Sequence, residues 1–170
     1  MKIHEFLISQ DACKDAKEWA EGQTWPEIYA ACHRGDWLLW LFARTNPELV
    51  RERVLAACHC ANTVRGLMKD PRSVAAVDAA IAFGVGKIDK QELKDAAGAA
   101  GDAGAAGAAG AAGDAAWAAW AAWAAGDAAW AAGAAWAAWA AAWAAGDANR
   151  QQTADICRRL LPIEIWNIEI

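Results

Sequence analysis

The feature that most restricts the fold is a tract in the second half of the chain built almost entirely from alanine, glycine and tryptophan. No proline occurs between Pro71 and Pro162, and alanine is the best helix-forming residue. Glycine recurs at every third position over 98–113, and tryptophan continues this rhythm, with some steps of four, over 117–143. The tract therefore predicts helix, although each glycine costs up to about 1 kcal/mol relative to alanine.

A spacing of three residues undershoots the helical turn of about 3.6 residues, so one straight α-helix would spread its tryptophans around its circumference. Three arrangements stay open: helices that break at the repeated Gly-Asp steps, a left-handed coil around a neighbour, and an extended glycine segment. We favour a helical hairpin that turns near Gly113-Asp114, with glycines of one helix facing tryptophans of the other. The residues expected to pack in this way are Gly104, Gly107, Trp117, Trp120, Trp123, Trp136 and Trp139.

The first ninety residues carry frequent helix-start signals and almost no strand signal. Between these signals, apolar residues recur at helical spacing, as in the segment 49–58. We therefore expect a bundle of about five helices in residues 1–90. The expected helix starts are Asp11, the capping box Thr24–Glu27, Asp36, Asn46-Pro47, Asp70-Pro71 and Asp89.

Polarity returns after the tract, and the segment TADICRRLL predicts an amphipathic helix that ends before Pro162. The final IEIWNIEI alternates like a strand, and we expect it to pack as an extended tail or to pair with the same tail in a dimer. Together these patterns predict an all-α protein. Its parts are a helical bundle (1–90), an Ala/Gly/Trp-rich helical hairpin (91–148) and a C-terminal helix with an extended tail (149–170).

The charge distribution argues against two classes of partner. The formal net charge is −5, and no basic residue lies between Lys94 and Arg150. A tract without cations does not replace phosphate counterions, so we expect no binding to a nucleic acid polymer. The uncharged stretch 128–146 is long enough to span a bilayer, but alanine and glycine gain little from lipid, so we expect no membrane partner.

Five cysteines, an odd number, and the absence of an apolar N-terminal stretch predict reduced thiols in a cytoplasmic protein. Cys58-His59-Cys60 with Cys32-His33 could supply zinc ligands, or a cysteine nucleophile with a histidine base. Neighbouring helical residues point about 100° apart, and no oxyanion loop accompanies the thiols. We therefore predict no enzyme activity, no metal and no cofactor.

Aromatic residues outside the tract are the candidates for binding. Trp19, Trp25 and Tyr29 are the expected anchors, because interface hot spots favour large aromatic side chains. We expect Trp37 and Trp40 to lie in the core instead. An aromatic slot for a small nucleotide signal is an alternative, with cations supplied by Arg34, Arg44 or Arg65.

The order of RGDWLLWLFAR (34–44), LAACHCAN (55–62), the alanine tract and the closing ADICRRLLP resembles the alanine-rich immunity proteins of bacterial toxin systems and their phage-borne relatives. The resemblance implies a non-enzymatic protein that binds another protein and neutralises it. We therefore expect an inhibitor that occludes a toxin or a host defence component. In this interpretation the tract hairpin provides either a rigid arm or the interface of a homodimer. The alternatives are a sponge for a small nucleotide signal and a structural protein that self-assembles through the tract.

Overall fold

The protein is all-α. The computed structural model describes residues 3–67, 71–96 and 146–168, and these ranges contain helices and irregular segments but no β-strand. The α-helices are α1 (Ile3–Ser9), α2 (Lys14–Trp19), α3 (Trp25–Ala31), α4 (Gly35–Thr45), α5 (Val50–Asn62), α6 (Pro71–Gly84) and α10 (Asp147–Leu160). Residues 90–96 are also helical, and single 3₁₀ turns form η1 (Arg65–Leu67) and η3 (Ile163–Ile165). The predicted hairpin, including Gly104, Gly107, Trp117, Trp120, Trp123, Trp136 and Trp139, lies outside the described residues.

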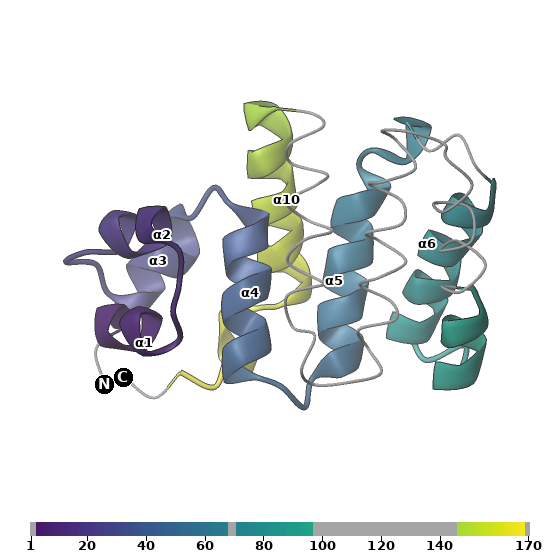
Figure 1. The fold of residues 1–170 in the computed structure, drawn as a ribbon, viewed down its shortest axis with the longest axis horizontal. Helices are drawn as coiled ribbons and strands as arrows, with labels where there is room; N and C mark the ends of the chain where they lie inside the picture. Colours follow the sequence, from purple (N-terminus) through teal and green to yellow (C-terminus); the bar gives the residue numbers. More distant parts are fainter. Residues whose placement is uncertain (1–2, 68–70, 97–145, 169–170) are drawn as a thin grey trace.

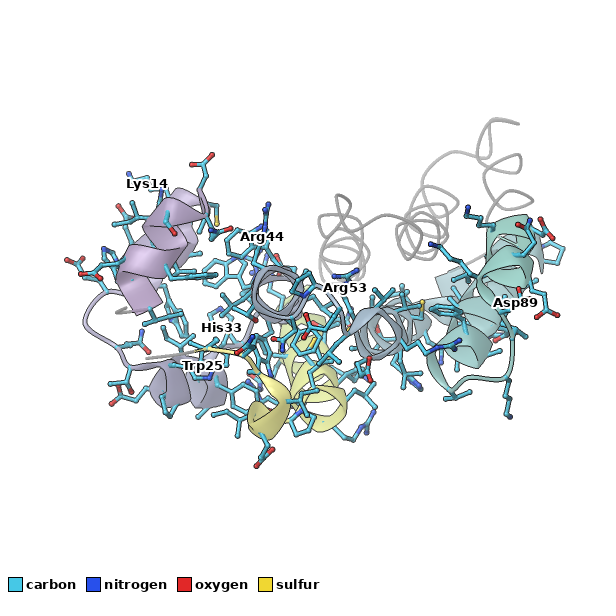
Figure 2. All side chains as sticks on the ribbon, turned by 90° about the horizontal axis from the view of Figure 1, so that it is seen from below. Lys14, Trp25, His33, Arg44, Arg53 and Asp89 are labelled. Carbon is cyan, nitrogen blue, oxygen red and sulfur yellow. The ribbon has the colours of Figure 1, made fainter. Side chains whose placement is uncertain are left out.

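The helices α4, α5 and α6 stand side by side in chain order, and the C-terminal helix α10 packs against both α4 and α5 (Figure 1). The short helices α1, α2 and α3 gather at the α4 end (Figure 1). The turn that holds Asp89 lies at the opposite end from Lys14 of α2 (Figure 2). Helix α10 thus returns the chain to its N-terminal half, although it follows α6 by more than sixty residues of sequence.

Two of the predicted helix starts are capping boxes, and both are confirmed. The backbone N–H and the hydroxyl of Thr24 each donate to Glu27 Oε2 at 2.7 Å, and these bonds lower the pKa of the Glu27 carboxyl. Asp89 Oδ1 accepts the backbone N–H groups of Gln91 and Glu92 at 2.7 and 2.9 Å, and its own N–H donates to Glu92 Oε2. Each box satisfies N–H groups that the first helical turn leaves without partners.

Asp11 was expected to cap a helix, and this expectation is wrong: α2 begins at Lys14. Asp11 instead ends α1, with a positive φ of 54°. Its N–H donates to the carbonyl of Ile8, and the N–H of Ala12 donates to that of Leu7. This pattern is a Schellman helix end, for which aspartate is a tolerated left-handed residue. Helix α1 itself was not predicted, because no N-cap residue precedes it in the sequence.

Asn46 was expected to start a helix with Pro47, and this expectation is also wrong, because α5 begins at Val50. Asn46 follows the last residue of α4 and is buried, where its side chain fixes the C-terminal tail. Its Nδ2 donates to the carbonyl of Ile165 at 2.8 Å, and its Oδ1 accepts the N–H of Asn167 at 3.2 Å. An extended segment outside a sheet has no neighbouring strand to pair with its backbone groups. The Asn46 amide takes that place for the tail, because it offers one donor and one acceptor.

The C-terminal tail packs against the rest of the chain. This is one of the two arrangements predicted from the sequence, the other being pairing with the same tail in a dimer. Its Trp166 is buried, with ring centroids 4.7 Å from Trp25 and 4.9 Å from Phe42. The indole N–H donates to the carbonyl of Leu161 at 2.8 Å, so the ring is buried without losing a polar partner. Residues 163–165 form a 3₁₀ turn rather than a strand, since no neighbouring strand offers ladder hydrogen bonds here.

The main core lies where α4 meets α5 and α10, with Leu38, Leu39 and Phe42 fully buried. Close approach of α10 to α4 depends on Gly35, because a Cβ built there would lie 2.7 Å from the backbone carbonyl carbon of Thr153. A second cluster joins α5 to α6 and to residues 90–96, and it comprises Val54, Cys58, Ala76, Ala80, Phe83 and Leu93. The two cores share α5 as their common wall.

We predict that Gly35→Ala destabilises the protein by about 1–3 kcal/mol, because the added methyl group overpacks the contact with Thr153. The matched control is Gly66→Ala, since a Cβ at Gly66 meets nothing within 4 Å. That control is expected to be neutral or slightly stabilising. Urea unfolding followed by circular dichroism measures both. Equal midpoints for the two variants would contradict the account of the α4–α10 contact.

We predict that Asn46→Ala lowers the free energy of unfolding by about 1–3 kcal/mol, because it removes the partner of the Ile165 carbonyl and of the Asn167 N–H at a partly buried contact. The control Asn167→Ala removes an exposed amide and is expected to change stability by less than about 0.5 kcal/mol. Proteolysis of the last eight residues should accelerate in the first variant only. A tail that stays protected in Asn46→Ala would show that the amide does not hold it.

Candidate functional site

The candidate site is an open apolar pocket of about 380 Å³ at the N-terminal end of the molecule. Ile3 and Leu7 of α1 and the small residues Ala16 and Ala20 line it on one side, and the first two turns of α4 line the other. A pocket of this size accommodates a small molecule or a few side chains of a partner. The small side chains of Ala12, Ala16 and Ala20 leave part of this space unfilled.

Aromatic side chains form one wall of the pocket. The Trp19 ring of α2 lies 5.8 Å from the Trp37 ring of α4, measured between centroids. Next to this pair, the exposed His33 ring lies 6.4 Å from Trp19 and 6.5 Å from Trp37, on the side of α4 that faces the short helices (Figure 2). Trp40 also lines the pocket, one helical turn beyond Trp37. Such a wall offers flat apolar surface together with indole N–H donors.

An ion pair stands at the start of α4 beside this wall. Arg34 donates two hydrogen bonds to Asp36, from Nε to Oδ1 at 2.8 Å and from Nη2 to Oδ2 at 2.6 Å. The hydrogen bond to Asp36 raises the pKa of Arg34 further above its ordinary value. The guanidinium also lies 4.7 Å from the Trp37 ring centroid. The charge of Arg34 is therefore already matched, and the pocket favours apolar, uncharged groups over a free anion.

Local sequence explains where this pair sits. Arg34 is the residue before α4, and Asp36 lies in the first turn, where the helix dipole favours an acidic group. From the far side, Arg158 of α10 donates to the carbonyls of Tyr29 and Cys32 at 3.1 and 2.7 Å. These bonds fix the end of α3 and hence the turn that leads into the pocket wall.

The structure brings together two of the four predicted binding residues. Trp19 and Arg34 both line the pocket. Trp25 is not a surface anchor: it is 4% exposed and stacks on Trp166 of the tail. The Tyr29 hydroxyl donates toward the carbonyls of Arg158 and Leu161 at 3.0 and 3.1 Å, so this side chain ties α3 to α10. Its partial burial raises the pKa of the phenol.

Trp37 and Trp40 were expected in the core, but both are only partly buried and face the pocket. Among the pocket residues that the sequence did not predict are Ile3 and Leu7, which belong to the unpredicted helix α1. Their spacing of four residues is a helical stripe and was the available signal. A pattern of only seven residues without an N-cap residue is a weak signal for a helix.

The cysteines were considered in the sequence as metal ligands or nucleophiles, and four of the five are buried. In the part of the chain that the structure describes, no group of three or more histidine, cysteine, aspartate or glutamate side chains is placed to hold a metal ion. Cys58 is fully buried in the α5–α6 cluster, and burial raises the pKa of its thiol to about 12. Burial likewise raises the pKa of Cys32 to about 11. Thiols of this kind are poor nucleophiles at neutral pH, since little thiolate forms.

Comparisons with known families, with characterised proteins and with solved structures found no match to this chain. The similarity to alanine-rich immunity proteins therefore stays a prediction from sequence. Over residues 3–67, 71–96 and 146–168, no helix is long and apolar enough to cross a membrane.

We predict that Ala16→Phe fills the pocket without unfolding the protein, because the ring enters existing apolar space. Binding of Nile red, an uncharged dye that fluoresces in apolar sites, should fall at least about twofold relative to the unmodified chain. The matched control Ala75→Phe, at an exposed position of α6, should leave binding unchanged. Equal dye binding by both variants would show that this pocket does not take an apolar ligand.

Proposed function

We propose that this chain is a non-enzymatic binding protein that neutralises a toxin or a host defence component by occlusion. In this proposal it acts in the cytoplasm, and its pocket receives an apolar or aromatic side chain of the target protein. The observation that carries the proposal is an open apolar pocket walled by tryptophans, next to an arginine whose charge is already matched. Such a site favours burial of apolar surface over binding of a charged substrate.

The composition of the wall supports a protein target. Tryptophan and arginine are enriched among the residues that dominate binding energy at protein interfaces. Here Trp19, Trp37 and Trp40 are partly exposed around one cavity, and Arg34 stacks on Trp37. A single target side chain entering the cavity would contact several of them at once. The immunity role implied by the sequence resemblance requires this kind of contact.

The nucleotide sponge has weaker support, because its three candidate cations are otherwise engaged. Arg34 pairs with Asp36, and Arg65 pairs with Asp78 at 2.6 Å. Arg44 lies 5.4 Å from the ring centroid of Trp40. A phosphate entering the pocket would meet the Asp36 carboxylate as well as Arg34, and the two contributions oppose each other.

We predict that a photoreactive benzoylphenylalanine at position 40, in place of Trp40, crosslinks the chain to one defined protein in its native cells. The same group in place of the exposed Ala75 is the matched control and should not give this adduct. Adding Ala16→Phe to the first variant should abolish the adduct, because the filled pocket no longer admits the target. Mass spectrometry identifies the adduct.

Two outcomes would contradict the proposed function. Identical adducts from positions 40 and 75 would mean that contact is not specific to the pocket. A small molecule that copurifies with the chain, and that Ala16→Phe releases in native mass spectrometry, would favour the sponge instead.

A further inference from the structure

The thiols of Cys60 and Cys157 meet inside the main core, although the two residues are 97 positions apart in sequence. Cys60 belongs to α5 and Cys157 to α10, and their Sγ atoms are 3.8 Å apart. Both side chains are almost completely buried. This is the approach of two reduced thiols in van der Waals contact, and both cysteines are free in the structure.

We propose that Cys60 and Cys157 form an oxidative modification site, at which a peroxide converts the two thiols to an intramolecular disulfide joining α5 to α10. A disulfide requires the sulfurs to close to about 2.05 Å, a movement of less than about 2 Å from their present separation. The two helices already pack against each other, so the backbone separation is set by the fold.

The chemistry balances with hydrogen peroxide as the oxidant. One sulfur, as thiolate, attacks a peroxide oxygen; the O–O bond breaks, and a sulfenic acid and one water form. The second sulfur then attacks the sulfenic sulfur, an S–S bond forms, and the hydroxyl leaves as a second water. In total, two thiols and one peroxide give one disulfide and two waters, and the sulfurs lose the two electrons that the peroxide gains.

The surroundings of the pair make it a selective site. The contact with Cys60, together with burial, raises the pKa of Cys157, so the Cys157 thiol is protonated at rest. Reaction therefore depends on transient opening of the α5–α10 contact, which admits a small uncharged oxidant more readily than a bulky or charged one. Once one sulfur is oxidised, the other is the nearest reductant, and this proximity favours the disulfide over further oxidation.

Cys58 provides a matched control, because it lies on the same helix and is equally buried but belongs to the other cluster, with Val54 and Phe83. The exposed Cys13 would give disulfides between molecules, so the experiment uses Cys13→Ser throughout. In this background the variants Cys58→Ala, Cys60→Ala and Cys157→Ala are compared with the parent chain. Circular dichroism before treatment verifies that each is folded.

The folded proteins are treated with hydrogen peroxide, unfolded in N-ethylmaleimide at mildly acidic pH, and digested with trypsin without reductant. Cleavage releases the peptides 54–65 and 151–158. Because peptide 54–65 holds both Cys58 and Cys60, the variants are needed to assign the bond. We expect the linked pair of peptides from the parent and from Cys58→Ala, and its loss in Cys60→Ala and Cys157→Ala.

Absence of the linked pair from the parent chain would overturn the proposal, as would its persistence in Cys60→Ala or its loss in Cys58→Ala. The parent and Cys58→Ala decide the matter even where an alanine at position 60 or 157 prevents folding. The result is also independent of the pocket, because neither sulfur lines it.

Discussion

The return of α10 onto the N-terminal half of the chain is the contact on which the rest of the described structure depends. Its closest point is Gly35, where the absence of a side chain lets Thr153 approach the start of α4. Nearby, the thiol of Cys157 lies 3.5 Å from the Gly35 carbonyl oxygen as a weak donor. The same helix donates from Arg158 to the end of α3. One helix therefore positions both elements that lead into the pocket wall.

This dependence links the candidate site to the far end of the sequence. Arg34 and Asp36 line the pocket. The turn that carries them contacts α10 on its other side, where Thr153 lies against Gly35 and Arg158 donates to the Cys32 carbonyl. The tail extends the effect, since Trp166 fills the space beneath Trp25. A change in α10 is thus expected to reach the pocket through packing alone, because a close-packed interior transmits displacement with little loss.

Local signals in the sequence predicted most helices but not the site. Capping boxes at Thr24 and Asp89 identify helix starts because their hydrogen bonds stay within a few residues. The burial of the aromatic residues depends on partners that are distant in sequence. Trp25 is buried against Trp166, whereas Trp37 is partly exposed at the pocket beside Trp19 of α2. Nothing in a local pattern distinguishes these two outcomes. Asn46 is a similar case, since its turn-forming character is local but its partner is the tail.

The pairing of Arg34 with Asp36 decides what kind of ligand the pocket can prefer. A lone arginine at this wall would attract phosphates and carboxylates, whereas a bidentate pair presents a nearly neutral, planar surface that stacks on Trp37. Asp36 is itself buried, so separating the pair would leave a buried carboxylate without its partner. The free-energy cost of such a separation exceeds the stabilisation that most single contacts provide. An anion that approached Arg34 would also meet the repulsion of the Asp36 carboxylate, but an apolar side chain would not. Under the proposed function, the ion pair would make the space between α1, α2 and α4 less favourable for charged ligands than for apolar ones.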